Sequence, residues 1–134
     1  MTRNTPAGAR RWQRARHDRG SSPVEFAIVA AAMILVGFAV IQVGLVWHAR
    51  SIALGAATQG VGAGRGYLAP LDAADTTARH FLDHAGDGLA EQNVTVTTTA
   101  TEVRVTVTGT AITILPGVRF TISQTAHGSI EQPS

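Results

Sequence analysis

Residues 26–47 read FAIVAAAMILVGFAVIQVGLVW, a run without formal charge in which Gln42 is the one strongly polar side chain. A helix rises about 1.5 Å per residue, so this run covers about 33 Å, close to the hydrocarbon thickness of a bilayer. The alternative is a core helix of a soluble protein, but such helices rarely stay apolar on every face over this length. The run therefore predicts a transmembrane helix, with Trp47 at the membrane interface.

Charge is distributed unevenly around this run. Residues 1–20 carry six arginines against one aspartate, whereas residues 51–134 carry four arginines against seven carboxylates. By the positive-inside rule, the basic leader stays in the cytoplasm and the acidic remainder faces outward. A basic arm can also bind nucleic acid by neutralising phosphates. Because the arginines stand beside a membrane span, we interpret them as an orientation signal and expect no nucleic-acid partner.

Length and composition limit the possible functions. The chain has 134 residues, of which 45% are apolar and 15% charged, and it contains no cysteine. One small domain remains after the span, which argues against a large enzyme core. Disulfides, a thiolate nucleophile and a cysteine zinc site are excluded. His80 and His84 are four residues apart, but no third ligand is evident, so we expect solvent-facing histidines, no metal, no cofactor and no enzyme activity.

After the span, the helix is expected to continue to residue 58 with small residues at Ala49, Ala53 and Ala57, a spacing that allows close helix packing. Glycines at alternate positions from Gly60 to Gly66 weaken a helix and predict a hinge or a frayed end. They do not match a phosphate-binding loop, because the required spacing and context are missing. The predicted organisation is a basic cytoplasmic leader at 1–20, a transmembrane helix with its extension at 21–58, a Gly-rich linker at 59–71 and a small extracytoplasmic domain at 72–134.

The domain begins with helical periodicity and continues with strand periodicity. Asp72 can cap an amphipathic helix that runs to about Leu89. Apolar residues then alternate with polar ones, which predicts antiparallel strands with a turn at Pro116 and Gly117. The alternating apolar residues are Val94, Val96, Val103, Val105, Val107, Ile112, Ile114, Val118, Phe120 and Ile122. The fold class is therefore α+β, with a sheet too small to be stable without packing against a helix or a neighbour.

The junction before the span, DRGSSPVEF at residues 18–26, places a carboxylate beside the apolar run. Such a charge is costly to leave unpaired at a membrane and needs an explanation. One explanation is local: Ser22, Pro23 and Glu25 occupy the N-cap, N1 and N3 positions, which makes a capping box. The carboxylate would also lie near the positive end of the helix dipole.

The second explanation is a signal for processing and assembly. A short basic leader that ends in Gly20, followed by Glu25, Phe26 and an unbroken apolar helix, resembles the type IV prepilin class. RGSSPVEFAIVAAAMILVGFAVIQ, the Ala-rich HARSIALGAATQGVGAGRG and the later Thr/Val-rich segments resemble TadE-like pseudopilins of tight-adherence pilus systems, over most of residues 19–130.

The resemblance implies that a membrane aspartic prepilin peptidase cuts between Gly20 and Ser21. Glu25, with Phe26 beside it, would then set the register by pairing with the new α-amino group of a neighbouring subunit. The implied partners are the peptidase, other pilin-like subunits, pilus or secretion machinery and the lipid bilayer.

Two functional hypotheses follow. In the first, the chain is a non-enzymatic, single-pass pilin-like subunit of the cell membrane, matured after Gly20. In the second, it is a permanently anchored envelope protein whose outer β domain binds a partner or ligand, and Glu25 only caps the helix.

Overall fold

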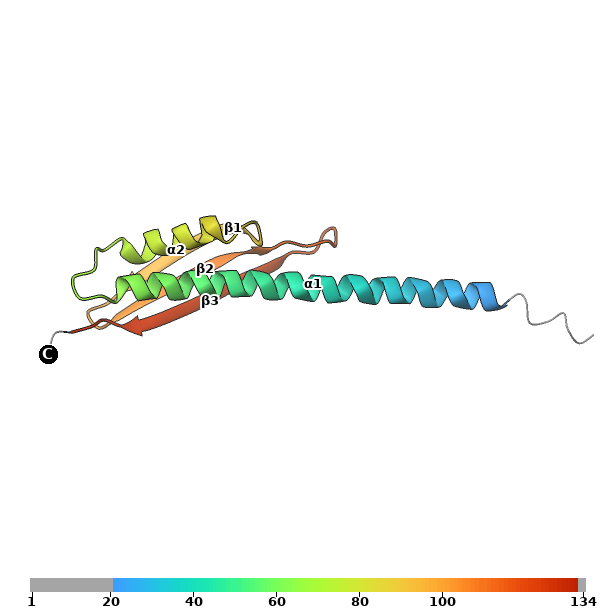
Figure 1. Cartoon of the computed structure of the whole chain (residues 1–134), viewed down its shortest axis with the longest axis horizontal. Helices are drawn as coiled ribbons and strands as arrows, with labels where there is room; N and C mark the ends of the chain where they lie inside the picture. The colour runs from blue at the N-terminus through green and yellow to red at the C-terminus, as the bar shows by residue number, and fades with distance from the viewer. Residues whose placement is uncertain (1–20, 133–134) are drawn as a thin grey trace, which may run out of the picture. The chain divides into compact units, whose positions relative to one another are not determined.

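The computed structural model describes residues 21–132, and of residues 21 and 22 only the backbone. The predicted leader, including Gly20, lies outside these residues. Within the described range the elements are, in order, α1 (Ser21–Gly64), α2 (Ala73–His84), β1 (Leu89–Thr98), β2 (Glu102–Ala111) and β3 (Phe120–Ser129) (Figure 1). A long apolar helix, a second helix and an antiparallel sheet confirm the predicted α+β class.

The described residues divide into two units, of which the first ends at Phe38 and the second begins at Ala39. The described part of the first unit is the N-terminal segment of α1, whose side chains from Pro23 onward are exposed except for the half-buried Ala30. Within the described residues, α1 is the one helix long and apolar enough to cross a membrane. None of its most apolar stretch is buried, unlike the core helix of a soluble protein.

The second unit contains a three-stranded sheet in the order β1-β2-β3, with both neighbouring pairs antiparallel. On the central strand, Val105 lies opposite Val96 of β1 and Ala126 of β3. The register of β1 shifts between Ala90 and Asn93, where Glu91 has a positive φ of 51°. A β-bulge of this kind re-aims one side chain, here toward the end of β2.

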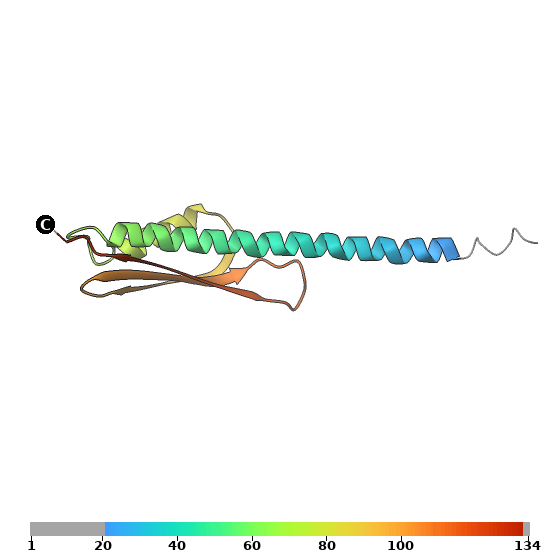
Figure 2. The same ribbon diagram turned by 90° about the horizontal axis from the view of Figure 1, so that it is seen from below.

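The C-terminal part of α1 and all of α2 cover the same face of this sheet (Figure 2). The predicted small residues Ala49, Ala53 and Ala57 are fully buried in the core between them. Threonines alternate with the valines along β2 and point to the other face, where Thr106 bonds to Thr125 at 2.9 Å. The core consists of Ala49, Ile52, Ala53, Ala56, Ala57, Val61, Ala74, Ala78, Leu82, Leu89, Val94, Val103, Val105, Val107, Ala111 and Ile122.

The prediction of a hinge or frayed end at the glycines is wrong for residues 60–64, which continue α1. Their packing explains the difference. A Cβ built on Gly60 would stand 2.7 Å from the carbonyl oxygen of Ala74, and one on Gly64 would stand 2.9 Å from the Cβ of Ala74. Glycine here lets α1 approach α2 closely, and burial of the neighbouring core offsets its low helix propensity.

The predicted end of the second helix at Leu89 is also wrong. Helix α2 ends at His84, Gly86 follows with φ of 81°, and Leu89 is the buried first residue of β1. A glycine in the left-handed region is a common way to end a helix. Asp72 stands at the predicted N-cap position, but its side chain makes no capping hydrogen bond.

The loop between β2 and β3, residues 112–119, departs from strand geometry. Ile112 and Ile114, predicted as strand residues, lie in this loop, as does Val118. The predicted turn is present: Gly117 has φ of 80°, and the amide of Val118 donates to the carbonyl oxygen of Leu115. The alternation of isoleucines therefore belongs to an apolar loop and not to a half-buried strand.

Candidate functional site

The predicted processing and assembly motif lies at the start of α1. The described part of α1 starts at Ser21, the predicted first mature residue, and Glu25 follows four residues later. Ser22 and Glu25 were expected at the N-cap and N3, but Ser21 and Ser22 are already helical, so the helix starts at least two residues earlier than that assignment. The first four helical amides have no partner within a helix, so Pro23 is still accommodated in the first turn. Capping by Ser22 itself stays a prediction, since its side chain is not described.

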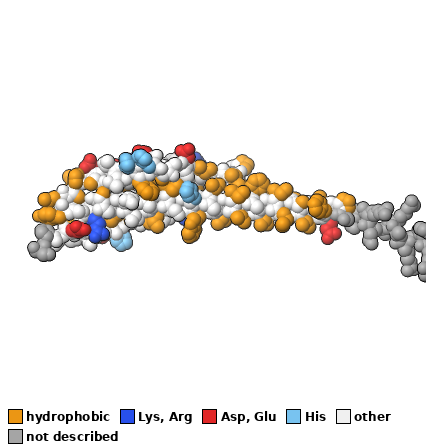
Figure 3. All heavy atoms as spheres, in the orientation of Figure 1, with side chains coloured by type: hydrophobic (Ala, Val, Ile, Leu, Met, Phe, Trp, Pro, Cys, Tyr) orange, Lys and Arg blue, Asp and Glu red, His pale blue; other side chains and the backbone are white. Residues whose placement is uncertain are grey.

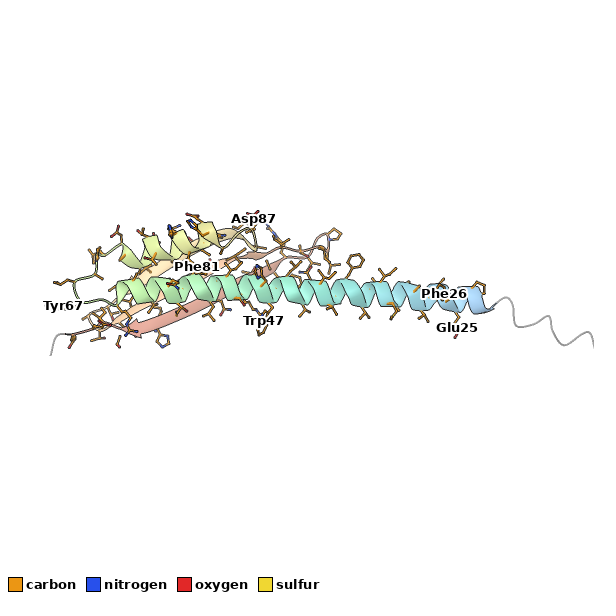
Figure 4. All side chains as sticks on the ribbon, viewed as in Figure 1. Glu25, Phe26, Trp47, Tyr67, Phe81 and Asp87 are labelled. Carbon is orange, nitrogen blue, oxygen red and sulfur yellow. The ribbon has the colours of Figure 1, made fainter. Side chains whose placement is uncertain are left out.

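Glu25 and Phe26 both project from the surface of α1 (Figure 4). Phe26 is 74% exposed. Glu25 is the one formal charge between residues 21 and 47, and none of the four ion pairs among the described residues involves it. An exposed carboxylate in an otherwise uncharged stretch of helix is available for a partner outside the chain.

Apolar side chains continue along the same helix (Figure 3). The large ones that are exposed include Ile28, Met33, Leu35, Phe38 and Val43. An exposed apolar surface of this extent is typical of a surface that contacts lipid or other proteins.

Gln42 is the one buried residue between Pro23 and His48, being only 5% exposed. Its Nε2 donates to the carbonyl oxygen of Ile112 at 3.3 Å, and its Oε1 accepts from the backbone N–H of Ile114 at 3.1 Å. The hydroxyl of Thr113 donates to the same oxygen at 3.2 Å. One side chain of α1 therefore holds three consecutive residues of the β2–β3 loop.

Sequence reasoning noticed Gln42 as an interruption of the apolar run but gave it no role. The signal that could have identified it is an amide side chain that would need hydrogen-bond partners in an apolar environment. Its partners are about seventy residues away along the chain. Nothing in the local pattern points to them.

A groove of about 560 Å³ lies between the exposed side of α1 and the edge strand β3. A smaller hollow of about 330 Å³ adjoins it and shares Trp47 and Arg50. Trp47 is 71% exposed and projects away from α1 (Figure 4). The groove is lined by Trp47, Arg50, Ser51, Leu54, Thr121, Ile122, Ser123 and Gln124.

An ionic contact joins the bulge of β1 to the segment before β3. Glu91 accepts a hydrogen bond from the hydroxyl of Thr110 at 2.9 Å and pairs with Arg119 at 2.9 Å. These contacts lower the pKa of Glu91, chiefly through the Thr110 hydrogen bond and then through the charge of Arg119. The contact ties the two edge strands together at one end of the sheet.

The histidines stand where the helical spacing predicts. The rings of His80 and His84 lie 4.2 Å apart on the exposed side of α2. Among residues 21–132 there is no group of three or more His, Asp or Glu side chains that could hold a metal ion.

Comparison with known families gives one result. The family model described as TadE-like protein matches residues 20–61, and it thereby confirms over this segment the resemblance noted in the sequence. The matched segment begins at Gly20 and includes most of α1. Comparisons with curated proteins and with solved structures give no match.

Proposed function

We propose that this chain, which is TadE-like over residues 20–61, is a non-enzymatic, single-pass pseudopilin of a tight-adherence pilus assembly or secretion system. The observation that carries the proposal is the order of features in the matched segment. The family match begins at Gly20, Glu25 lies near the N-terminal end of the described part of α1, and the exposed apolar surface of α1 follows directly. The proposed processing site, the carboxylate and a membrane or assembly surface are thus adjacent in the chain.

Maturation is the first step of the proposed mechanism. A prepilin peptidase cuts between Gly20 and Ser21, which removes the arginine-rich leader and exposes a new α-amino group at Ser21. A residue without a side chain suits an extended substrate in a narrow protease cleft. The leader determines orientation before the cut, because its arginines hold the N-terminus in the cytoplasm and place the domain on the other side.

Assembly is the second step. Glu25 on one helix pairs with the α-amino group of Ser21 on a neighbouring helix, while Phe26 and the apolar surface beside it contact the neighbour or lipid. In a medium of low dielectric constant an unpaired carboxylate is strongly unfavourable. The helices therefore slide until the charges meet, and Glu25 determines their register. Other pilin-like subunits and the pilus or secretion machinery are the partners; neither a cofactor nor nucleic acid takes part.

One observation favours the second candidate, a permanently anchored envelope protein whose outer domain binds a partner or ligand. This observation is the groove between α1 and β3, lined by Trp47, Leu54 and residues 121–124. In that case the leader stays attached and Glu25 has only a local effect at the helix end.

N-terminal sequencing of the membrane-associated protein from cells that contain the peptidase separates the two candidates. A mature chain that starts at Ser21 supports the pseudopilin. An N-terminus at Met1, or a cut near Ala57, contradicts it. Gly20→Ile is expected to abolish the cut, whereas Gly8→Ile in the same leader serves as the matched control and leaves it unchanged.

Glu25→Gln tests the assembly step separately. The variant keeps the size of the side chain and removes the charge, so the pseudopilin loses assembly while membrane insertion is unaltered. Glu102→Gln, in the sheet, is the control that assembles normally. If Glu25 acts only on its own helix end, the change costs at most about 1 kcal/mol of local helix stability and assembly persists.

A further inference from the structure

We propose that the β2–β3 loop, residues 112–119, enters the interfacial region of the bilayer that α1 spans, where the side chains of Ile112, Ile114 and Leu115 contact lipid. The proposal rests on the membrane span of α1, which belongs to the proposed function, but not on cleavage or assembly. It assigns the domain a second membrane contact besides the helix.

The first argument is the level at which the loop lies along α1. The loop is bonded to Gln42, and both Figure 1 and Figure 2 show it beside this helix. Gln42 precedes Trp47 by five residues, or about 7.5 Å along a helix, and Arg50 by eight, or about 12 Å. An exposed Trp is typical of the membrane interface. Trp47 indicates the level of the membrane interface. The loop therefore lies closer to the hydrocarbon core than Trp47 does.

The second argument is the length of bare helix that remains. Residues 23–41 are apolar apart from Glu25, and they extend over about 28 Å, which by itself suffices for a hydrocarbon core. The polar amide of Gln42 then falls at the edge of the hydrocarbon region and not within it. The chemistry of the helix and the position of the loop thus indicate the same boundary.

The third argument is the surface of the loop itself. Residues 111–118 carry no charge, and four large apolar side chains are each about two-fifths exposed. They are Ile112 at 42%, Ile114 at 41%, Leu115 at 41% and Val118 at 38%. The first charge after them, Arg119, is paired with Glu91. An apolar tip with a charged base is the pattern of a segment that sits at a membrane surface.

The fourth argument is that several polar backbone groups of the loop have hydrogen-bond partners within the protein. Irregular backbone is tolerated at membrane depth only where its polar groups have partners. Gln42 binds the carbonyl of Ile112 and the amide of Ile114, and Thr113 Oγ1 accepts from the amide of Leu115 at 3.1 Å. Pro116 has no amide hydrogen, and the amide of Val118 donates to Leu115. The loop thus turns these polar groups inward and its apolar side chains outward.

Depth-dependent fluorescence quenching tests the proposal. The chain has no cysteine, so each of Leu115→Cys, Ile34→Cys and Thr97→Cys introduces a single thiol for an environment-sensitive NBD label. All three sites are exposed, so the label does not disturb the core. The labelled full-length chains are reconstituted in phosphatidylcholine–phosphatidylglycerol vesicles that contain lipids with a nitroxide either near the headgroup or deep in the acyl chain.

We expect the label at position 115 to lose fluorescence mainly with the shallow nitroxide, the label at 34 mainly with the deep one, and the label at 97 with neither. If position 115 behaves like position 97 while position 34 is quenched, the loop lies in water and this inference is wrong although the span is intact. If position 34 is also unquenched, the span fails and the proposed function fails with it. Protection of position 115 from aqueous iodide without nitroxide quenching means that protein covers the loop, which also overturns the lipid assignment.

Discussion

Gly60 of α1 packs against the backbone of α2 at Ala74: a Cβ built on Gly60 would stand 2.7 Å from the carbonyl oxygen of Ala74 and 3.1 Å from the Cβ of Ala78. A carbonyl oxygen within a helix cannot move aside without breaking the helix geometry. The two helices therefore depend on glycine at this position, although glycine is a poor helix former.

Gly60→Ala is expected to destabilise the domain by about 1–3 kcal/mol, because overpacking exceeds the gain in helix propensity. Gly62→Ala is the matched control: Gly62 is in the same helix, and an added Cβ meets nothing within 4 Å. That variant should be unchanged or more stable by up to about 1 kcal/mol. Thermal unfolding of the full chain in detergent micelles, followed by circular dichroism, measures both. Equal effects of the two substitutions would contradict the packing account.

The contact between Gly60 and Ala74 also shows what cannot be predicted from the local sequence. The alternating valines predict strands because strand geometry alone puts every second residue on one face, and Val103, Val105 and Val107 are indeed buried. The same local reasoning misreads Gly60, because its helical state depends on a contact with α2. Propensity describes a helix in isolation, and tertiary packing overrides it.

Among the functional residues, too, one can be identified from the sequence and another cannot. Glu25 stands out in the sequence because a carboxylate beside an apolar run is rare in a membrane segment. The partners of Gln42 could not be predicted, since residues 112–114 are about seventy residues away along the chain and approach it only in the tertiary structure. The role of Glu25 requires a neighbouring chain and stays a prediction.

Gln42→Leu removes the side chain that holds the β2–β3 loop and leaves the amide of Ile114 without its acceptor. We expect a loss of about 1–3 kcal/mol and faster hydrogen exchange at that amide. Gln59→Leu is the matched control, because Gln59 is an exposed residue of the same helix. NMR or mass-spectrometric hydrogen exchange of the full chain in micelles compares them. Unchanged exchange at Ile114 in Gln42→Leu would show that the loop is held by other contacts.

Thr110→Val removes the hydrogen bond that contributes most to the lowered pKa of Glu91. The pKa of Glu91 should rise toward its ordinary value of about 4.3, with Arg119 still lowering it. Thr108→Val, two residues earlier on the same strand, should leave this pKa unchanged. A carboxyl ¹³C titration of Glu91 gives the comparison. If the pKa of Glu91 is the same in both variants, the Thr110 hydroxyl does not bind the carboxylate in solution.

The same contact gives a pH dependence with a definite sign. Because folding lowers the pKa of Glu91, its contribution to stability is fully present above the unfolded pKa and is lost as the pH falls through the folded value. The difference in stability between the wild type and Glu91→Gln should therefore be constant near neutral pH, begin to fall near the unfolded pKa of about 4.3 and vanish only below the lowered pKa of the folded state. The pair is exposed, so the difference is small. A difference that grows on acidification contradicts the assigned sign.

Gly55 and Phe81 test a second contact between α1 and α2, in which the obstacle is a side chain and not the backbone. A Cβ on Gly55 would stand 2.9 Å from the Cζ of Phe81, and the next two nearest atoms belong to the same ring. Gly55→Ala should therefore be destabilising in the wild type and nearly neutral in Phe81→Leu, where the distal ring atoms are gone. A coupling energy of about 0.5–3 kcal/mol is expected for residues in contact.

Gly60→Ala provides the control for this cycle, because its obstacle is the carbonyl oxygen of Ala74 and not the ring. Its effect should be the same in the wild type and in Phe81→Leu, so that the two changes are additive within about 0.5 kcal/mol. If Phe81→Leu reduces the destabilisation caused by Gly55→Ala and by Gly60→Ala equally, α2 shifts as a rigid body and the two contacts are not separate. If it relieves only Gly55→Ala, α1 and α2 are fixed by two distinct contacts, one with a ring that can be shortened and one with a backbone that cannot move.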